Sequence, residues 1–139
     1  MIRAHLATFP ARAGILMQTV QSILPQVDKL CICLNQYEDV PTPLAQEPKI
    51  ETLIPDRDLK DAGKFAFEAA ADDFVFTIDD DILYPPDYVK TTLQYFDRLG
   101  PAETCPGLYG PRLAERRRNR GDWMEKLDVW QKDPLSVQG

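Results

Sequence analysis

Residues 74–84 read FVFTIDDDILY, and this stretch decides the fold. An apolar run, 74–78, stops at three consecutive aspartates, Asp79, Asp80 and Asp81, before two further apolar residues. A short run that is apolar on both faces is typical of a buried strand in a parallel sheet. Adjacent carboxylates beside apolar residues repel one another strongly, so they weaken a fold unless a cation or several hydrogen-bond donors offset the repulsion.

Two interpretations of the acid triplet follow from the residues alone. The first is a strand end whose acids are solvated by water. The second is a site for a hard cation, because Mg²⁺, Mn²⁺ and Ca²⁺ prefer oxygen ligands and Mg²⁺ commonly combines one or two protein carboxylates with substrate phosphates. The sequence of the neighbouring segments is needed to distinguish the solvated strand end from the cation site.

The chain alternates strand-like and helix-like segments. Apolar runs bounded by prolines, glycines or charges predict strands over 2–9, 29–34, 49–54 and 74–78. Helical spacing, alanine content and Pro or acid start signals predict helices over 13–24, 61–71 and 88–99. This alternation predicts an α/β fold with a mostly parallel sheet flanked by helices, in which ligands bind beyond the carboxyl ends of the strands. The acid triplet stands at such an end.

The pattern weakens beyond residue 100. Residues 116–121, RRRNRG, indicate a charged loop, 123–130 a short helix, and 134–139, PLSVQG, the start of a strand. We therefore expect residues 1–139 to be a single domain that is the N-terminal part of a longer one.

Composition excludes several classes of function. The 139 residues carry a net charge of −6, which disfavours a nucleic-acid or anionic membrane surface, although the local arginine run opposes that balance. No stretch has the length of a membrane span, the N-terminus lacks a signal peptide, and we expect a cytoplasmic protein. Cys31 and Cys33 alternate along a strand and should lie on one buried face, which indicates neither a disulfide framework nor a zinc site. His5, inside an apolar run, is assigned no role.

Four segments together resemble a known family: ATFPAR (7–12), LNQYEDVP (34–41), DLKDAGKF (58–65) and TIDDDILYPPDYV (77–89). Over nearly the whole chain, the sequence resembles the nucleotide-diphospho-sugar glycosyltransferases of the Rossmann-like GT-A fold, especially bacterial enzymes similar to family 2. The resemblance implies a transferase that binds a nucleotide sugar and serves surface or capsular polysaccharide assembly.

The resemblance also implies where the nucleotide lies. Its base and ribose would meet Thr8, Pro10 and Arg12 after the first strand, and Asn35 and Asp39 after the second. The family usually has an acid in place of Asn35 to accept a hydrogen bond from uracil, so a UDP-sugar is the first candidate while the base stays open. For Arg12, a solvated position at the start of a helix is the equal alternative.

The same resemblance suggests how the diphosphate is held. Lys64 would lie in the first turn of the predicted helix, where its ammonium and the unpaired amides face the diphosphate; a surface lysine paired with Asp61 or Glu68 is the alternative. Asp79 and Asp81 would occupy the Asp-x-Asp positions that meet ribose and ligate Mn²⁺ or Mg²⁺, with Asp80 sharing either task. In such a site the cation and the lysine would offset the repulsion within the triplet.

The sequence identifies neither the acceptor nor the catalytic base. Glu115, Asp122 and Glu125 are acids in the last forty residues, and none has a distinguishing spacing. A metal-dependent nucleotidyltransferase is a rival, although ATFPARAG has only one glycine where that class has a glycine-rich phosphate loop. A nucleotide- or metal-binding module without catalysis is the rival outside enzymes.

Overall fold

Four of the apolar runs pair as neighbouring strands in the computed structural model, which describes residues 1–99, 112–113 and 124–125. Their order across the sheet is β3-β2-β1-β4, and all three pairings are parallel. The strands are β1 (Ile2–Thr8), β2 (Lys29–Leu34), β3 (Ile50–Leu53) and β4 (Phe74–Thr77). The predicted α/β class and the four predicted strands are confirmed, with ends that differ by at most one residue.

Short helices connect the strands. β1 leads through a 3₁₀ turn into α1, a second 3₁₀ turn follows, a single helical turn precedes β3, and a third 3₁₀ helix precedes β4. In chain order these are η1 (Pro10–Arg12), α1 (Ala13–Ile23), η2 (Leu24–Gln26), α2 (Thr42–Ala45) and η3 (Lys60–Phe65). Pro10 at the first position of η1 and Pro25 within η2 fit their helices because an unpaired amide is expected at these positions anyway.

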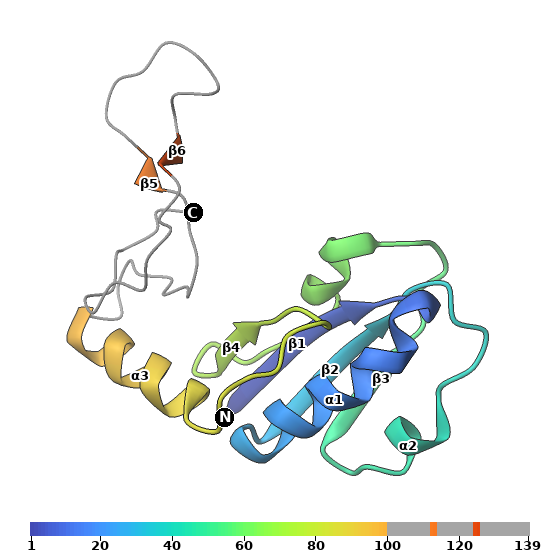
Figure 1. Cartoon of the computed structure of the whole chain (residues 1–139), viewed down its shortest axis with the longest axis horizontal. Coiled ribbons are helices and arrows are strands. Elements are labelled where there is room, and N and C mark those ends of the chain that lie inside the picture. The colour runs from blue at the N-terminus through green and yellow to red at the C-terminus, as the bar shows by residue number, and fades with distance from the viewer. Residues whose placement is uncertain (100–111, 114–123, 126–139) are drawn as a thin grey trace. The chain divides into compact units, whose positions relative to one another are not determined.

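The main core lies between α1 and one face of the sheet (Figure 1). Leu6 of β1 is opposite Ile32 of β2, and both are fully buried. Leu16, Val20 and Ile23, spaced along one side of α1, are at most 2% exposed. Burying side chains of this size stabilises a fold by about 1.5–3 kcal/mol each, so this layer supplies much of the stability of the domain.

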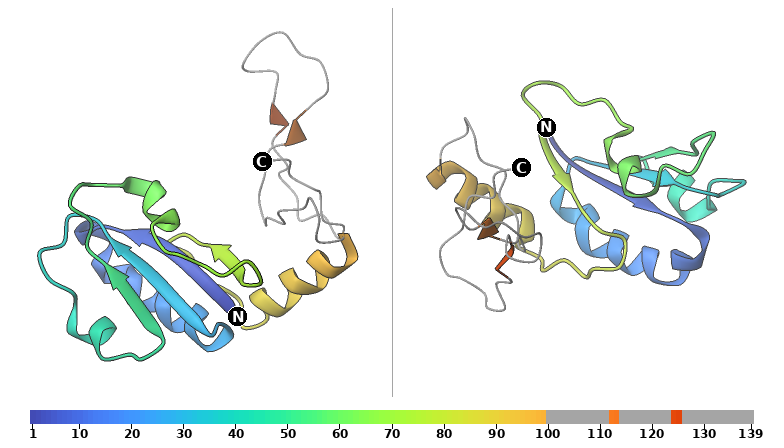
Figure 2. Two further views of the ribbon diagram at one scale, coloured as in Figure 1. Left: turned by 180° about the vertical axis from the view of Figure 1, so that it is seen from behind. Right: turned by 90° about the horizontal axis from the view of Figure 1, so that it is seen from above.

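The opposite face of the sheet is covered by η3 (Figure 2). Cys31 and Cys33 of β2 point to this face and are fully buried, as their alternation predicted. Gly63 of η3 approaches so closely that a Cβ atom built on it would lie 2.6 Å from Cys33 Sγ and 3.2 Å from the Cβ of Ala7. Only a glycine allows the helix backbone to pack directly on the strands here.

The helix predicted over 61–71 is wrong. Only Lys60–Phe65 is helical, as a 3₁₀ helix closed by the Ala66 amide, which donates to the Gly63 carbonyl at 3.2 Å. The carbonyl of Lys64, which would accept from residue 68 in an α-helix, instead accepts from His5 Nδ1 at 3.1 Å. Phe67 packs on the ring of His5, with centroids 5.4 Å apart. Contacts with the buried histidine therefore override the helix propensity of the alanines.

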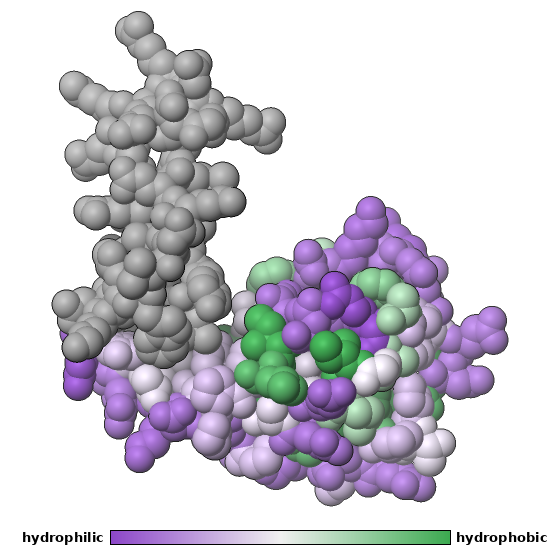
Figure 3. All heavy atoms as spheres, viewed as in Figure 1, coloured by the Kyte–Doolittle hydropathy of each residue, from purple (hydrophilic) through white to green (hydrophobic). Residues whose placement is uncertain are grey.

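β4 lies at an edge, which differs from the buried strand that its composition predicts. Within the described part of the chain β4 pairs only with β1, so half of its backbone groups lack strand partners there. Phe76 is 9% exposed, whereas Phe74 is 39% and Val75 42% exposed. Elsewhere on the surface of residues 1–88, hydrophobic patches stand among hydrophilic ones (Figure 3).

Residues Val89–Gly139 form a second unit, separate from Met1–Tyr88. Helix α3 (Tyr88–Leu99) matches the predicted helix and contributes most of its residues to this unit. β5 (Arg112–Leu113) pairs antiparallel with β6 (Met124–Glu125), so the short helix predicted over 123–130 is wrong at these two residues. The arginine run and the strand predicted over 134–139 lie outside the described residues.

Asp73 fastens the start of β4 to the start of β1. Its carboxylate pairs with Arg3 Nε at 2.7 Å, with the α-amino group of Met1 at 3.1 Å, and with the backbone amide of Ala70 at 3.1 Å. The bond from Arg3 is the largest cause that lowers the pKa of Asp73, from 3.8 to about 2. A carboxyl whose pKa is lower in the folded state stabilises the protein above its unfolded pKa.

We expect Asp73→Asn to lower the melting temperature at pH 7. The stabilisation by the charged Asp73 is complete above pH 3.8 and is lost as the pH falls towards about 2, so parent and variant should converge over that interval. Thermal unfolding followed by circular dichroism between pH 2 and pH 7 measures this. A constant difference in melting temperature across the range would contradict the role of the charge.

Substitution of Gly63 should be costly, and Gly14 offers a matched control. Gly63→Ala places a methyl group against Cys33 and Ala7, and such overpacking typically costs about 1–3 kcal/mol. A Cβ on Gly14, inside α1, meets nothing within 4 Å, and alanine there should raise the free energy of unfolding by up to about 1 kcal/mol. Urea unfolding of both variants tests the pair; equal stabilities would show that η3 does not rest on the sheet as described.

Candidate functional site

The order of the strands determines where a ligand fits. β2 and then β3 are added on one side of β1, and β4 is added on the other side, so the strand order reverses between β1 and β4. Such a switch point opens a crevice beyond the strand ends. A pocket of about 250 Å³ lies there, where β1, β2 and β4 end. It is lined by Ala7, Thr8, Phe9, Arg12, Asn35, Lys60, Asp61, Asp79, Asp80 and Asp81.

The backbone of the acid triplet is held by hydrogen bonds from three elements. Tyr84 Oη accepts from the Asp79 amide at 2.9 Å and donates to the Asp79 carbonyl at 3.4 Å. Thr19 Oγ1 of α1 donates to the Asp80 carbonyl at 2.9 Å in a buried position. The Ile78 amide donates to the His5 carbonyl at 3.0 Å, which continues the strand pairing up to the triplet. The three carboxylates are thus attached to a fixed turn.

Basic side chains from two other segments neutralise the outer two acids. Lys64 Nζ lies 2.5 Å from Asp79 Oδ1, and Arg12 Nη1 pairs with Asp81 Oδ2. The bond to Asp81 raises the pKa of Arg12. The Asp79 and Asp81 side chains line the pocket and are 57% and 39% exposed, so both carboxylates face water.

Asp80 points inward. It is 8% exposed, and its Oδ2 has no hydrogen-bond partner among the described residues. Tyr37 lies near enough that the charge of Asp80, after burial, raises the pKa of the tyrosine. A buried carboxylate oxygen without a partner is unfavourable, so this atom is available to a ligand or an ion.

The residues suit a divalent cation that is shared with a ligand rather than one enclosed by protein. In the described part of the chain, no three His, Cys, Asp or Glu side chains are arranged to surround a metal ion. However, Mg²⁺ usually takes only one or two protein carboxylates and completes its octahedron with water and phosphate oxygens. Asp79 and Asp81, partly exposed at one pocket, offer that number of carboxylates.

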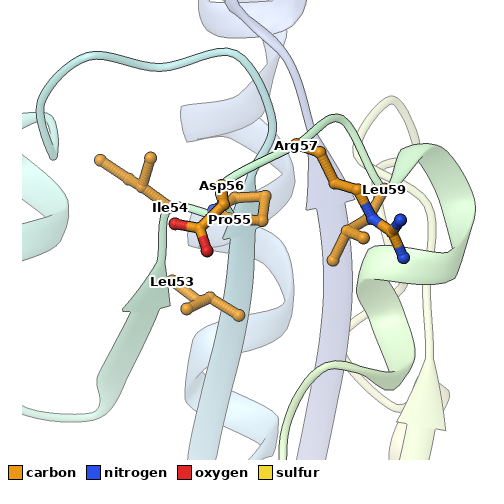
Figure 4. A pocket seen from close by; sticks show the side chains of 6 residues that line it. All are labelled: Leu53, Ile54, Pro55, Asp56, Arg57 and Leu59. Carbon is orange, nitrogen blue, oxygen red and sulfur yellow. The ribbon is translucent and has the colours of Figure 1, made fainter.

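A larger hollow, of about 380 Å³, lies at the end of β3 and is lined by fewer charged residues. Leu53, Ile54, Pro55 and Leu59 make it mostly apolar, and Asp56 and Arg57 are its charged residues (Figure 4). The titratable groups gather instead in the smaller pocket at the switch point, which we take as the site.

Comparison with protein families identifies the chain. The family described as Glycosyl transferase family 2 matches residues 15–138. The chain belongs to this family. It is therefore a glycosyltransferase, and its parallel sheet with flanking helices is that of the GT-A fold, as the sequence resemblance predicted. The search of curated proteins found no match. In the described residues, no helix is long and apolar enough to cross a membrane.

The structure brings most of the predicted site residues of this family 2 glycosyltransferase together. Those that line the pocket are Thr8, Arg12, Asn35, Asp79, Asp80 and Asp81, and Lys64 reaches Asp79 at its mouth. Pro10 begins η1 beside the pocket, and Asp39 is exposed in the loop after β2; neither lines it. The family match begins at Ile15, so it includes Asn35, Lys64 and the acid triplet.

The amide of Asn35 is already occupied. Its Oδ1 accepts from the Leu59 amide at 2.9 Å, and its Nδ2 donates to the Lys60 carbonyl at 3.2 Å. Asn35 therefore braces the loop before η3. Its predicted contact with a nucleotide base stays a prediction.

The predicted setting of Lys64 is wrong. Lys64 lies in the last turn of η3, not in the first turn of a long helix, so free helical amides do not surround it. Neither of the alternative partners, Asp61 and Glu68, forms its ion pair; Asp79 does. Its ammonium lies beside the acid triplet, and its predicted contact with a diphosphate stays a prediction.

Sequence reasoning missed several residues that shape the site of this glycosyltransferase. Tyr84 and Thr19 hold the acid turn, Tyr37 lies beside Asp80, and Lys60 lines the pocket. Tyr84 follows Asp79 by only five residues, so its contact with the turn is local in the sequence. The others depend on contacts between distant segments and carry no signal of their own.

We expect Tyr84→Phe to destabilise the acid turn. The variant keeps the ring contact with Tyr88 but leaves the Asp79 amide without its acceptor, which typically costs about 1–3 kcal/mol in a partly buried place. Urea unfolding measures the loss, and Tyr95→Phe, at a half-buried position of α3, is the control that removes a hydroxyl outside the site. Equal losses in the two variants would contradict the role of Tyr84.

Proposed function

We propose that this domain transfers a sugar from a nucleotide-diphospho-sugar to an acceptor, using a divalent cation, Mn²⁺ or Mg²⁺, and that the donor is a UDP-sugar. One observation carries the proposal: a fixed turn with three carboxylates lines one pocket at the switch point of the sheet together with Arg12, and Lys64, from another segment, pairs with the first of these carboxylates. Binding of a diphosphate together with a cation needs this combination of acids and bases.

In the proposed reaction the bond between the anomeric carbon and the diphosphate oxygen breaks while the acceptor oxygen forms a bond to that carbon. The electron pair of the broken bond leaves with the nucleoside diphosphate, so negative charge accumulates on its phosphates. Arg12 and Lys64 would stabilise that charge when phosphate oxygens replace Asp81 and Asp79 as their partners. The ion pairs with the acid triplet thus hold both basic side chains in place for the donor.

The carboxylates released by this exchange would hold the cation. Asp81 is the first candidate ligand, with Asp79 as the second, and Asp80 would orient a donor hydroxyl or a metal-bound water with its unpartnered Oδ2. When bound, the cation would act as a Lewis acid that neutralises the departing diphosphate. Thr8, at the end of β1, lies where the ribose would enter.

An inverting transfer also needs a base that accepts the proton of the acceptor hydroxyl. We assign none. Glu115 and Asp122 lie outside the described residues, and Glu125 is the second residue of β6. The resemblance to bacterial enzymes supports surface or capsular polysaccharide assembly as the process, with an acceptor that stays open.

Calorimetry of UDP binding with and without Mn²⁺ tests the proposal. We expect tight binding only when both are present, and Asp81→Asn should remove most of the Mn²⁺ dependence because an amide is a much poorer ligand for a hard cation. Asp72→Asn, at an exposed turn outside the pocket, is the matched control. If Asp81→Asn kept the full Mn²⁺ dependence, Asp81 would not be a ligand.

Lys64→Ala tests the diphosphate contact separately. Loss of a charged hydrogen bond should weaken UDP binding by about 1–3 kcal/mol, while binding of uridine, which lacks phosphates, should not change. Lys90→Ala, at an exposed position of α3, is the control for removal of a lysine. UDP affinity equal to that of the parent would exclude Lys64 from the phosphate site.

A further inference from the structure

Two described residues other than glycine have left-handed backbone angles, and both stand near the pocket in the chain. Gln36, with φ 61°, follows Asn35 after β2, and Lys60, with φ 51°, begins η3 and lines the pocket. Residues with a Cβ atom rarely adopt this region, and neither glutamine nor lysine is among the types that tolerate it well. Such residues persist only where the surroundings enforce them.

The surroundings of Lys60 enforce its conformation through both of its backbone groups. Its amide donates to Asp58 Oδ1 at 2.9 Å, and its carbonyl accepts from Asn35 Nδ2 at 3.2 Å. The other oxygen of Asp58 accepts from Gln36 Nε2 at 2.8 Å, so one carboxylate links the two left-handed residues. These donors, the Lys60 amide first and then Gln36, lower the pKa of Asp58, so this residue stays charged at neutral pH. We call the three hydrogen bonds that link Asn35, Gln36, Asp58 and Lys60 the bracket.

A glycine at position 60 would satisfy the same bracket with less strain. Every bond to residue 60 in this turn involves its backbone, and glycine adopts a positive φ without the steric penalty of a Cβ atom. The lysine side chain makes no hydrogen bond in the turn, although its charge attracts Asp58, and its Cβ atom adds the strain of a positive φ. Strain that is kept at the wall of a pocket points to a use for that side chain in the pocket.

The charges in the pocket indicate what that use is. Arg12 and Lys64 are both paired with acids of the triplet. The ammonium of Lys60 has no carboxylate within ion-pairing distance among the described residues, and the residue is exposed at the pocket. Lys60 is thus a cation beside the site that an anionic ligand can meet without first displacing an acid.

We propose that Lys60 is a third basic contact for the diphosphate of the donor, in addition to Arg12 and Lys64, and that its left-handed backbone is the strain kept to place it there. The inference rests on the proposed function, because it takes the bound anion to be a nucleoside diphosphate. An unpaired cation attracts the incoming diphosphate first, and the paired cations exchange partners afterwards. Lys60 begins η3, which carries Lys64 at its other end, whereas Arg12 belongs to η1.

Three substitutions separate the strain from the charge. Lys60→Gly removes both, Lys60→Asn removes the charge and keeps a residue type that tolerates a positive φ, and Lys60→Arg keeps both the charge and the strain. Each variant is measured by thermal unfolding without ligand and by calorimetry with UDP and with uridine in the presence of Mn²⁺.

We expect Lys60→Gly to melt at a higher temperature than the parent and to bind UDP about 5- to 10-fold more weakly, with unchanged binding of uridine. Lys60→Asn should lose UDP affinity to a similar extent, and Lys60→Arg should bind UDP within about 2-fold of the parent. Opposite effects on stability and on diphosphate binding would distinguish a binding residue from a purely structural one.

Two results would overturn the inference while leaving the proposed function intact: UDP affinity of Lys60→Gly equal to that of the parent, or a lower melting temperature of Lys60→Gly, which would show that the side chain supports the turn. Failure of the parent to bind UDP with either Mn²⁺ or Mg²⁺ would overturn the proposed function, and this inference with it.

Discussion

Repulsion among three adjacent carboxylates is the constraint on which the site depends. The structure relieves it by giving each acid different surroundings: Asp79 meets Lys64, Asp81 meets Arg12, and Asp80 turns inward. The two basic residues come from the segments after β1 and before β4, so the charges of the triplet bind together the loops that surround the pocket. A set of like charges that weakens an isolated strand end thereby becomes the centre of the site.

The second requirement is that β1 occupies the centre of the sheet. It pairs with β2 on one side and with β4 on the other, and its His5 holds the Lys64 carbonyl while the His5 carbonyl receives the Ile78 amide. Burial lowers the pKa of His5, so the ring stays neutral and donates one hydrogen bond at physiological pH. One buried histidine, to which the sequence assigns no role, thus fixes both the lysine segment and the acid turn.

Local patterns predict the elements here, and contacts between distant residues decide the site. Apolar runs with their bounding residues, together with helical spacing and start signals, place the four strands, α1 and α3 within one residue, since these patterns depend on near neighbours in the chain. The helix predicted over 61–71 does not form because His5 and the sheet contact its backbone, and helix propensity contains no information about such distant partners. The Arg12–Asp81 pair joins residues 69 positions apart, and the side chain of Asn35 accepts a hydrogen bond from an amide 24 residues away. No rule of sequence spacing predicts either contact.

Two kinds of contact, hydrogen bonds to the backbone and ion pairs exposed to water, explain how the site combines rigidity with the capacity to exchange partners. The hydrogen bonds that fix the acid turn, and those between Asn35 and the backbone of Leu59 and Lys60, are buried or part-buried, and breaking them leaves unpaired polar groups at considerable cost. The ion pairs have carboxylates open to water, where such pairs contribute only about 0–1 kcal/mol each. A phosphate group that replaces an acid at Arg12 or Lys64 therefore sacrifices little stability. The backbone of the pocket stays in place during such an exchange, because the groups that move are not the groups that hold the fold.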